Sequence, residues 1–126
     1  MRKTIVISGI ECNFKSSAAL PRIYRLKYGR DLIVDMMSLN KQITLQEKIK
    51  EETGEENSTL PLHSLEMFEN IAFIMHKHGD PSQPQEIEEW LEQFETFDIY
   101  KVFPEIIKLW KLENQQMSEP KKEIGK

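Results

Sequence analysis

Aromatic residues are concentrated in one stretch of this chain, and no other feature constrains its fold as strongly. Eight of the eleven lie between residues 62 and 112. They are Phe68, Phe73, Trp90, Phe94, Phe97, Tyr100, Phe103 and Trp110. Aromatic side chains bury more apolar surface than most others, so this stretch must supply much of the core.

The first part of that stretch predicts a central helix. Two neighbouring apolar stripes follow helical spacing. One consists of Leu65, Phe68, Ala72 and Met75, and the other of Met67, Ile71 and Ile74. A helix that is apolar around so much of its circumference is covered by other elements on several sides. Pro61 suits its first turn, and residues 79–81 end it.

Two further apolar patterns predict helices that pack on this one. The first is one-sided, as in a surface helix, with glutamates on the other face. Its apolar residues are Ile87, Trp90, Leu91 and Phe94. The second continues for about three turns and consists of Ile99, Val102, Phe103, Ile106, Ile107 and Trp110. Because Pro104 interrupts it, we expect either a kink or a short turn from Asp98 followed by a helix starting near Pro104.

The N-terminal residues predict a β-hairpin. Residues 4–7 and 12–15 read as strands joined by a turn at residues 8–11, where Gly9 supplies the positive φ that such turns need. A lone hairpin is marginal in water, so one of its faces must lie on the helices. That face contains either Ile5 and Ile7, or Val6 with Phe14.

Two helices are expected next. Ser16 and Ser17 are candidate N-caps for a helix over residues 18–28, which Gly29 ends. Asp31 can cap a second helix that runs through Leu39.

Residues 40–60 are polar and predict a variable, partly flexible segment. Thr44 and Glu47 fit a capping box, which favours a frayed helix over residues 45–52, followed by a loop at 54–59. Residues 113–126 have no apolar periodicity and predict a disordered tail. We therefore expect one mainly helical α+β domain over residues 1–112, with the N-terminal hairpin packed on a bundle of about four to six helices.

Length and composition narrow the class of protein. A chain of 126 residues has the length of a single domain and can bury a sizeable core. Cys12 is the only cysteine, which rules out an internal disulfide and a multi-cysteine metal site. The sequence contains neither a signal peptide nor an apolar run long enough to span a bilayer, so we expect a soluble, intracellular protein without membrane contacts.

Charge is distributed unevenly along the chain. Residues 1–50 hold ten Lys or Arg against four Asp or Glu, whereas residues 51–126 hold seven against seventeen. This asymmetry is compatible with two solvated faces, with head-to-tail self-association, or with docking on a charged partner. A dependence of association on salt would distinguish these interpretations.

No pattern of a catalytic or metal site is present. The sequence contains no glycine-rich nucleotide loop, nucleophile elbow or zinc-spaced cluster. His76 and His78 are about 200° apart on a helix, so we interpret them as structural or solvated. Glu88, Glu92 and Glu95 align on the predicted surface helix, and we interpret them as a solvated row. The chain is therefore not predicted to be an enzyme or to need a cofactor.

A basic helix is the remaining candidate binding feature. Arg22, Arg25 and Arg30 point outward in the predicted helical register and could contact a partner or phosphates. The acidic net charge of −4 and the lack of a helix-turn-helix pattern argue against nucleic acid as the partner. DNA binding by a small phage regulatory protein is the alternative interpretation.

The order of these weak motifs resembles the tail assembly chaperones of long-tailed bacteriophages and prophages of Gram-positive bacteria. The resemblance covers residues 3–112, with residues 40–60 as the variable part. In the first half it rests on the hairpin residues 5–9 and 14–15, and on residues 18–19, 21–25 and 28–32. In the second half it rests on residues 68–75, 89–91, 94–97, 99–100 and 109–110.

The resemblance implies a function in phage tail assembly. Members of the family are thought to coat the tape measure protein, keep it soluble and bring tail tube protein subunits to it, without being retained in the virion. The expected site of action is the cytoplasm of the bacterial host cell. Such genes often also yield a longer product by ribosomal frameshifting, in which residues 113–126 would be a linker. Lys121 and Lys122 of this segment are further candidate partner-binding residues.

Overall fold

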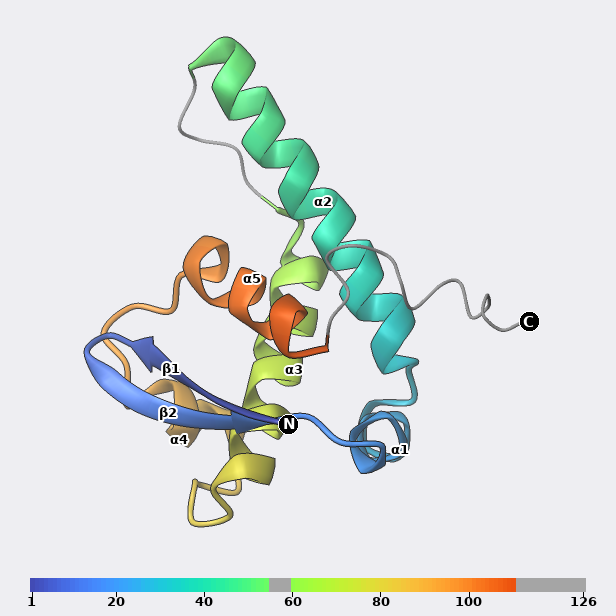
Figure 1. The fold of residues 1–126 in the computed structure, drawn as a ribbon, viewed down its shortest axis with the longest axis vertical. Helices are drawn as coiled ribbons and strands as arrows, with labels where there is room; N and C mark the ends of the chain where they lie inside the picture. The colour runs from blue at the N-terminus through green and yellow to red at the C-terminus, as the bar shows by residue number, and fades with distance from the viewer. Residues whose placement is uncertain (55–59, 111–126) are drawn as a thin grey trace.

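The computed structural model describes residues 1–54 and 60–110. In these ranges the chain forms an antiparallel hairpin followed by five helices, a mostly helical α+β fold (Figure 1). The elements are β1 (Arg2–Ile7), β2 (Ile10–Lys15), α1 (Ala19–Tyr28), α2 (Leu32–Thr53), α3 (Leu62–Gly79), α4 (Ile87–Leu91) and α5 (Ile99–Trp110). The expected fold class is confirmed. The predicted tail at 113–126 lies outside the described residues, as does most of the predicted loop at 54–59.

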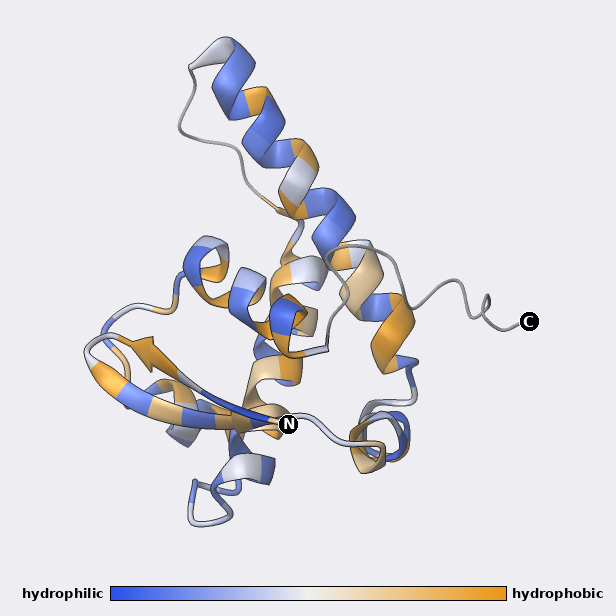
Figure 2. Cartoon of the chain, viewed as in Figure 1, coloured by the Kyte–Doolittle hydropathy of each residue, from blue (hydrophilic) through white to orange (hydrophobic). Residues whose placement is uncertain are grey.

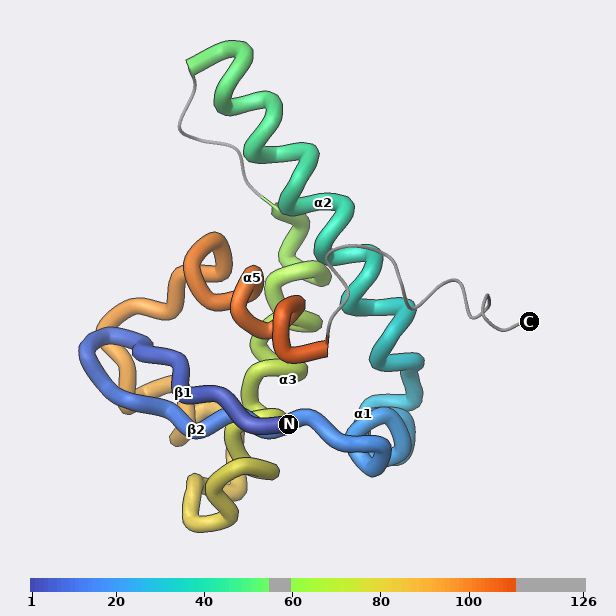
Figure 3. Tube along the Cα trace, viewed as in Figure 1, coloured from blue at the N-terminus to red at the C-terminus, as the bar shows by residue number. Residues whose placement is uncertain are grey.

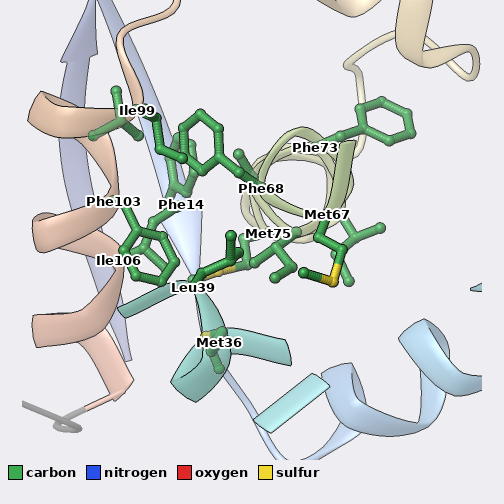
Figure 4. Close-up of a cluster of buried hydrophobic side chains, with 14 of the residues drawn as sticks. Phe14, Met36, Leu39, Met67, Phe68, Phe73, Met75, Ile99, Phe103 and Ile106 are labelled. Carbon is green, nitrogen blue, oxygen red and sulfur yellow. The ribbon is translucent and has the colours of Figure 1, made fainter. Parts of the chain in front are cut away.

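Helix α3 is the centre of the fold, as its two apolar stripes predict. It contacts β2 and each of the other four helices. Figure 4 shows Phe68 directed toward Phe103 of α5, and the two ring centroids are 6.2 Å apart. Phe73 leaves α3 on another side and packs against Trp90, which is fully buried.

The hairpin places Ile5 and Ile7 against the helices and leaves Val6 exposed. The antiparallel register pairs Ile5 with Cys12, so Cys12 and Phe14 share the buried face. The predicted four-residue turn is wrong, because Ile10 and Glu11 belong to β2. Ser8 and Gly9 alone form the turn, both at positive φ, as a tight two-residue hairpin turn requires.

The hairpin turn is held to the segment before α5. The Ser8 hydroxyl donates to the carbonyl of Thr96 at 2.7 Å and accepts from the Thr96 backbone N–H at 3.0 Å. Lys3 of β1 forms an ion pair with Glu105 of α5, in which Nζ lies 3.1 Å from Oε1. These contacts connect the two ends of the described chain.

Helix α2 is longer than expected, and the predicted break after residue 39 is wrong. The Asp31 carboxylate caps its first turn by accepting from the Val34 N–H at 3.1 Å, and Gly54 ends it in the left-handed region. No glycine or proline lies between these two residues to stop the helix. Beyond residue 40, Ile43 is buried, and Gln42 accepts a 2.7 Å hydrogen bond from Ser64 of α3.

The C-terminal half of α2 extends past the rest of the described molecule (Figures 1 and 3). Hydrophilic residues predominate there, with apolar residues between them (Figure 2).

The last two helices also differ from expectation. Helix α4 has only five residues, so Phe94, although buried, lies beyond its end. Helix α5 runs without a break from Ile99 through Pro104 to Trp110, which excludes a separate helix that starts near Pro104. Tertiary burial of α5 residues on both sides of the proline offsets the missing backbone donor.

Candidate partner-binding site

The candidate arginines are not equivalent in the structure. Arg22 and Arg25 are exposed on α1, as predicted. Arg30 instead turns to Asp35 of α2, and its Nε and Nη2 donate to the two carboxylate oxygens at 2.7 and 2.9 Å. Arg30 is exposed like the other two, with 44% of its side chain accessible, but it differs from them because it pairs with a buried carboxylate that needs a charged partner. Lys121 and Lys122 lie outside the described residues.

Asp35 is the centre of a polar cluster between α1 and α2. Its side chain is nearly inaccessible, and it also accepts a 2.7 Å hydrogen bond from the Tyr24 hydroxyl. Burial alone would raise the pKa of Asp35, but hydrogen bonds from Arg30 and Tyr24 outweigh it and hold the pKa below its usual value. Burial, followed by the bond to Asp35, raises the pKa of Tyr24. The cluster fixes the α1–α2 corner and leaves Asp35 ionised.

His76 belongs to the core. Its ring stacks on Phe14 with centroids 5.4 Å apart, and its Nδ1 accepts a 2.9 Å hydrogen bond from the Trp90 indole N–H. Burial lowers the pKa of His76, although Asp80 acts in the opposite direction. A neutral ring with an unprotonated Nδ1 suits this position, so the structural interpretation of His76 is supported by its contacts.

His78 and Cys12 are also engaged locally. His78 Nε2 lies 3.0 Å from the Ser17 hydroxyl, and burial, then the charges of Lys15 and Arg2, lower the pKa of His78. Burial raises the pKa of the Cys12 thiol to about 11, which makes it a poor nucleophile. Within residues 1–54 and 60–110, no group of three or more His, Cys, Asp or Glu is arranged to hold a metal ion.

The glutamate row does not form one helical face. Only Glu88 lies in α4, whereas Glu92 and Glu95 follow its end. All three side chains are exposed, as expected for a solvated row. Their predicted alignment is wrong because α4 stops after Leu91.

An unpredicted surface lies along the outer side of α2, which we call the outer α2 face and define by Val34, Met37, Lys41, Leu45 and Lys48. Its three apolar side chains retain 61%, 42% and 55% of their accessible surface, in chain order. Lys41, between Met37 and Leu45, and Lys48, beyond Leu45, are both exposed. A hollow of about 660 Å³ lies along this face. Its lining includes Met37, Lys41, Leu45, Lys48 and, from α5, Ile107.

The outer α2 face could have been found from its spacing. Val34, Met37, Lys41 and Lys48 follow the three-four alternation of residues that share a helix side. The predicted end of the helix after residue 39 divides this pattern into two parts, so the shared face is not recognised. Other apolar residues that could have served as contacts are less accessible: Met36 is buried, and Phe97 and Tyr100 are partly covered.

A second hollow of about 380 Å³ lies between α1 and the C-terminal end of α3. Its lining includes Ile23, Lys27, Phe73 and His78. Lys77 also borders it, but its ammonium group donates to the carbonyls of Pro81 and Gln83 at 3.0 and 2.7 Å. This hollow therefore presents mainly an apolar floor with Lys27 at the side.

Comparisons with known proteins gave no relative: no protein-family model, curated protein or solved structure matches the chain. No helix in the described ranges has the length and apolarity needed to cross a membrane.

Proposed function

We propose that this chain is a phage tail assembly chaperone that binds the tape measure protein and recruits tail tube subunits in the cytoplasm of the bacterial host cell. It acts without enzymatic chemistry and is not retained in the virion. The sequence resemblance over residues 3–112 supplies the family. The outer α2 face is the structural observation that carries the proposal.

This face has the properties of a binding surface. Isolated exposed apolar residues are common on proteins, but here Val34, Met37 and Leu45 share one side of one helix. Lys41 and Lys48 lie on the same side of the helix, and their charge keeps such a face soluble until a partner covers it. Tape measure proteins are long and helical, so a client of this type offers many equivalent stretches to an exposed helix face.

Weak and reversible contacts suit a chaperone that must leave the finished particle. Each copy needs only modest affinity if many copies bind along one client, because neighbouring sites act together. Lysines at the edge of an interface mainly speed association and set its salt dependence. The proposed coat would therefore assemble at low salt and come apart as salt is raised.

The proposal includes a longer product of the same gene. In that form the segment from residue 113 to about 120 joins a second domain, which binds the tail tube protein. Mass spectrometry of proteins expressed from the intact gene region tests this part. A minor species with residues 1 to about 120 fused to a second-frame extension is expected, and finding the 126-residue product alone would remove the two-form mechanism.

Co-expression tests the chaperone activity itself. The tape measure protein of the same tail gene cluster is produced alone, with this chain, and with an unrelated acidic protein of similar size. We expect a larger soluble fraction of the tape measure protein only with this chain. Equal solubility in all three cultures would refute the chaperone proposal.

A further inference from the structure

Helix α2 carries apolar residues on two opposite sides. Leu32, Met36, Leu39 and Ile43 face the core and are buried. The outer α2 face lies about half a turn away around the same helix, at 100° per residue. A helix at the surface of a protein is expected to be polar on the side away from the core. The outer face of α2 departs from that pattern.

The outer α2 face has the spacing of a helix-packing seam. Positions 34, 37, 41, 44 and 48 repeat at alternating steps of three and four residues, as the inward positions of packed helices do. Val34 and Met37 supply apolar contacts at the first two positions, and Leu45 lies beside the fourth. From residue 37 to residue 48 the seam is about 16 Å long, which is enough for three turns of a partner helix.

The charge of this seam selects among partners. Lys41 and Lys48 occupy equivalent positions seven residues apart, about 10 Å along the helix. Among the described residues, no carboxylate forms an ion pair with either ammonium group. Lysine at such a position disfavours pairing with an identical lysine-bearing seam and favours a carboxylate opposite it.

We propose that the outer α2 face binds one helix of a partner protein, an amphipathic helix with an apolar stripe flanked by carboxylates seven residues apart. The inference rests on the proposed function, because it names the kind of client segment that the chaperone selects. The client's apolar stripe packs on Met37 and Leu45, and its carboxylates lie against Lys41 and Lys48.

Two synthetic helical peptides test this recognition. Both are 21 residues long and share one leucine stripe, but one carries glutamates at seven-residue spacing on its flank and the other lysines. Binding of each to the full chain is followed by fluorescence anisotropy at 50 mM and 300 mM salt. We expect saturable binding of the glutamate peptide, at least about tenfold tighter than that of the lysine peptide at low salt, with the difference shrinking at high salt.

Variants locate the binding surface. Leu45→Glu should weaken binding of the glutamate peptide by at least about tenfold, because it places a carboxylate where an apolar contact is made. The double variant K41E/K48E should reverse the preference, so that the lysine peptide binds more tightly. The charge-matched control K27E/K101E changes two exposed cations elsewhere and should retain the original preference.

Several results would overturn the inference. Equal binding of both peptides, or a K41E/K48E variant that keeps the original preference, would exclude charge-selected recognition by this face. If Leu45→Glu converts a dimer of the free chain to a monomer in sedimentation, a second copy occupies the face. If a synthetic peptide of residues 111–126 displaces the glutamate peptide, the chain's own C-terminal segment occupies it.

The inference and the proposed function fail in different ways. A tape measure protein that binds the L45E variant as well as the unmodified chain would sink the inference and leave the chaperone proposal intact. Charge-selected peptide binding without any complex with the tape measure protein would support the inference and refute the chaperone proposal.

Discussion

Asp35 of α2 is a buried carboxylate whose two donors are Tyr24 of α1 and Arg30 of the segment between α1 and α2. Replacing it with alanine leaves the Tyr24 hydroxyl and the Arg30 guanidinium without their acceptor. We expect Asp35→Ala to lower the free energy of unfolding by about 2–3 kcal/mol, less than for a fully buried pair because Arg30 is partly exposed. Urea denaturation at pH 7 measures this loss.

The control for Asp35 is Glu47→Ala, an exposed carboxylate on the same helix, which should change stability by no more than about 0.5 kcal/mol. The pKa of Asp35 is depressed in the folded state, so its contribution is present above the unfolded pKa and is lost as pH falls through the folded value. Stability of the Asp35→Ala variant should therefore fall less steeply in acid than that of the unmodified chain. Equal losses of stability for the two alanine variants at pH 7 would contradict the role given to Asp35.

His76 gives a second pH dependence, of stability in mild acid. Burial depresses its folded pKa, so its contribution to stability is full above the unfolded pKa of about 6.5 and is lost as pH falls below that value. In His76→Asn the side-chain carbonyl takes the place of Nδ1 as acceptor for Trp90 but does not titrate. We expect this variant to be less stable at pH 7.5 and to have a flatter stability profile between pH 7.5 and 5.5, measured by tryptophan fluorescence in urea.

His63 provides the matched control for that profile, because it is exposed at the start of α3. His63→Asn should keep the profile of the unmodified chain. An unchanged slope in His76→Asn would show that His76 does not cause the pH dependence.

At the scale of elements, the contact between α3 and β2 depends on Gly79. Its carbonyl accepts a 3.1 Å hydrogen bond from Arg2, and a β-carbon at this position would overlap the backbone carbonyl of Asn13. We expect Gly79→Ala to cost at least about 3 kcal/mol in the free energy of unfolding, because rigid backbone must move apart. Thermal and urea unfolding measure the cost.

Gly29→Ala is the control that separates the cost of steric overlap at Gly79 from the cost of backbone strain. Gly29 ends α1 at a φ of 70°, with open space where a β-carbon would stand. Strain alone should cost about 1 kcal/mol there. If Gly79→Ala costs no more than Gly29→Ala, the close approach of α3 to β2 is not a constraint on this fold.

The elements that could be predicted from sequence are those with strong local signals. Asp31 and Gly29 set the boundary between α1 and α2, and the paired stripes of α3 placed it at the centre. The predictions failed where tertiary contacts decide. Helix α2 continues past residue 39 with Ile43 buried and Gln42 bonded to Ser64, and neither contact is visible in local spacing.

For the whole molecule, the candidate site was predicted only in part. Positive charge in the first half of the chain pointed to α1, and Arg22 and Arg25 are indeed exposed. Arg30 is exposed too, but its ion pair with Asp35 was not predicted, because Asp35 is buried by the packing of the helices rather than by any local sequence signal. The outer α2 face was missed because the predicted break concealed a pattern that needs a continuous helix.

The measurement that tests the central claim most directly is the molar mass of the complex between this chain and the purified tape measure protein. Size-exclusion chromatography with light scattering is run at 50 mM and 500 mM salt. The proposal predicts several copies of the chain on each tape measure molecule at low salt, and fewer copies at high salt. If the two proteins elute separately at low salt, each with the molar mass that it has alone, the chaperone account is wrong.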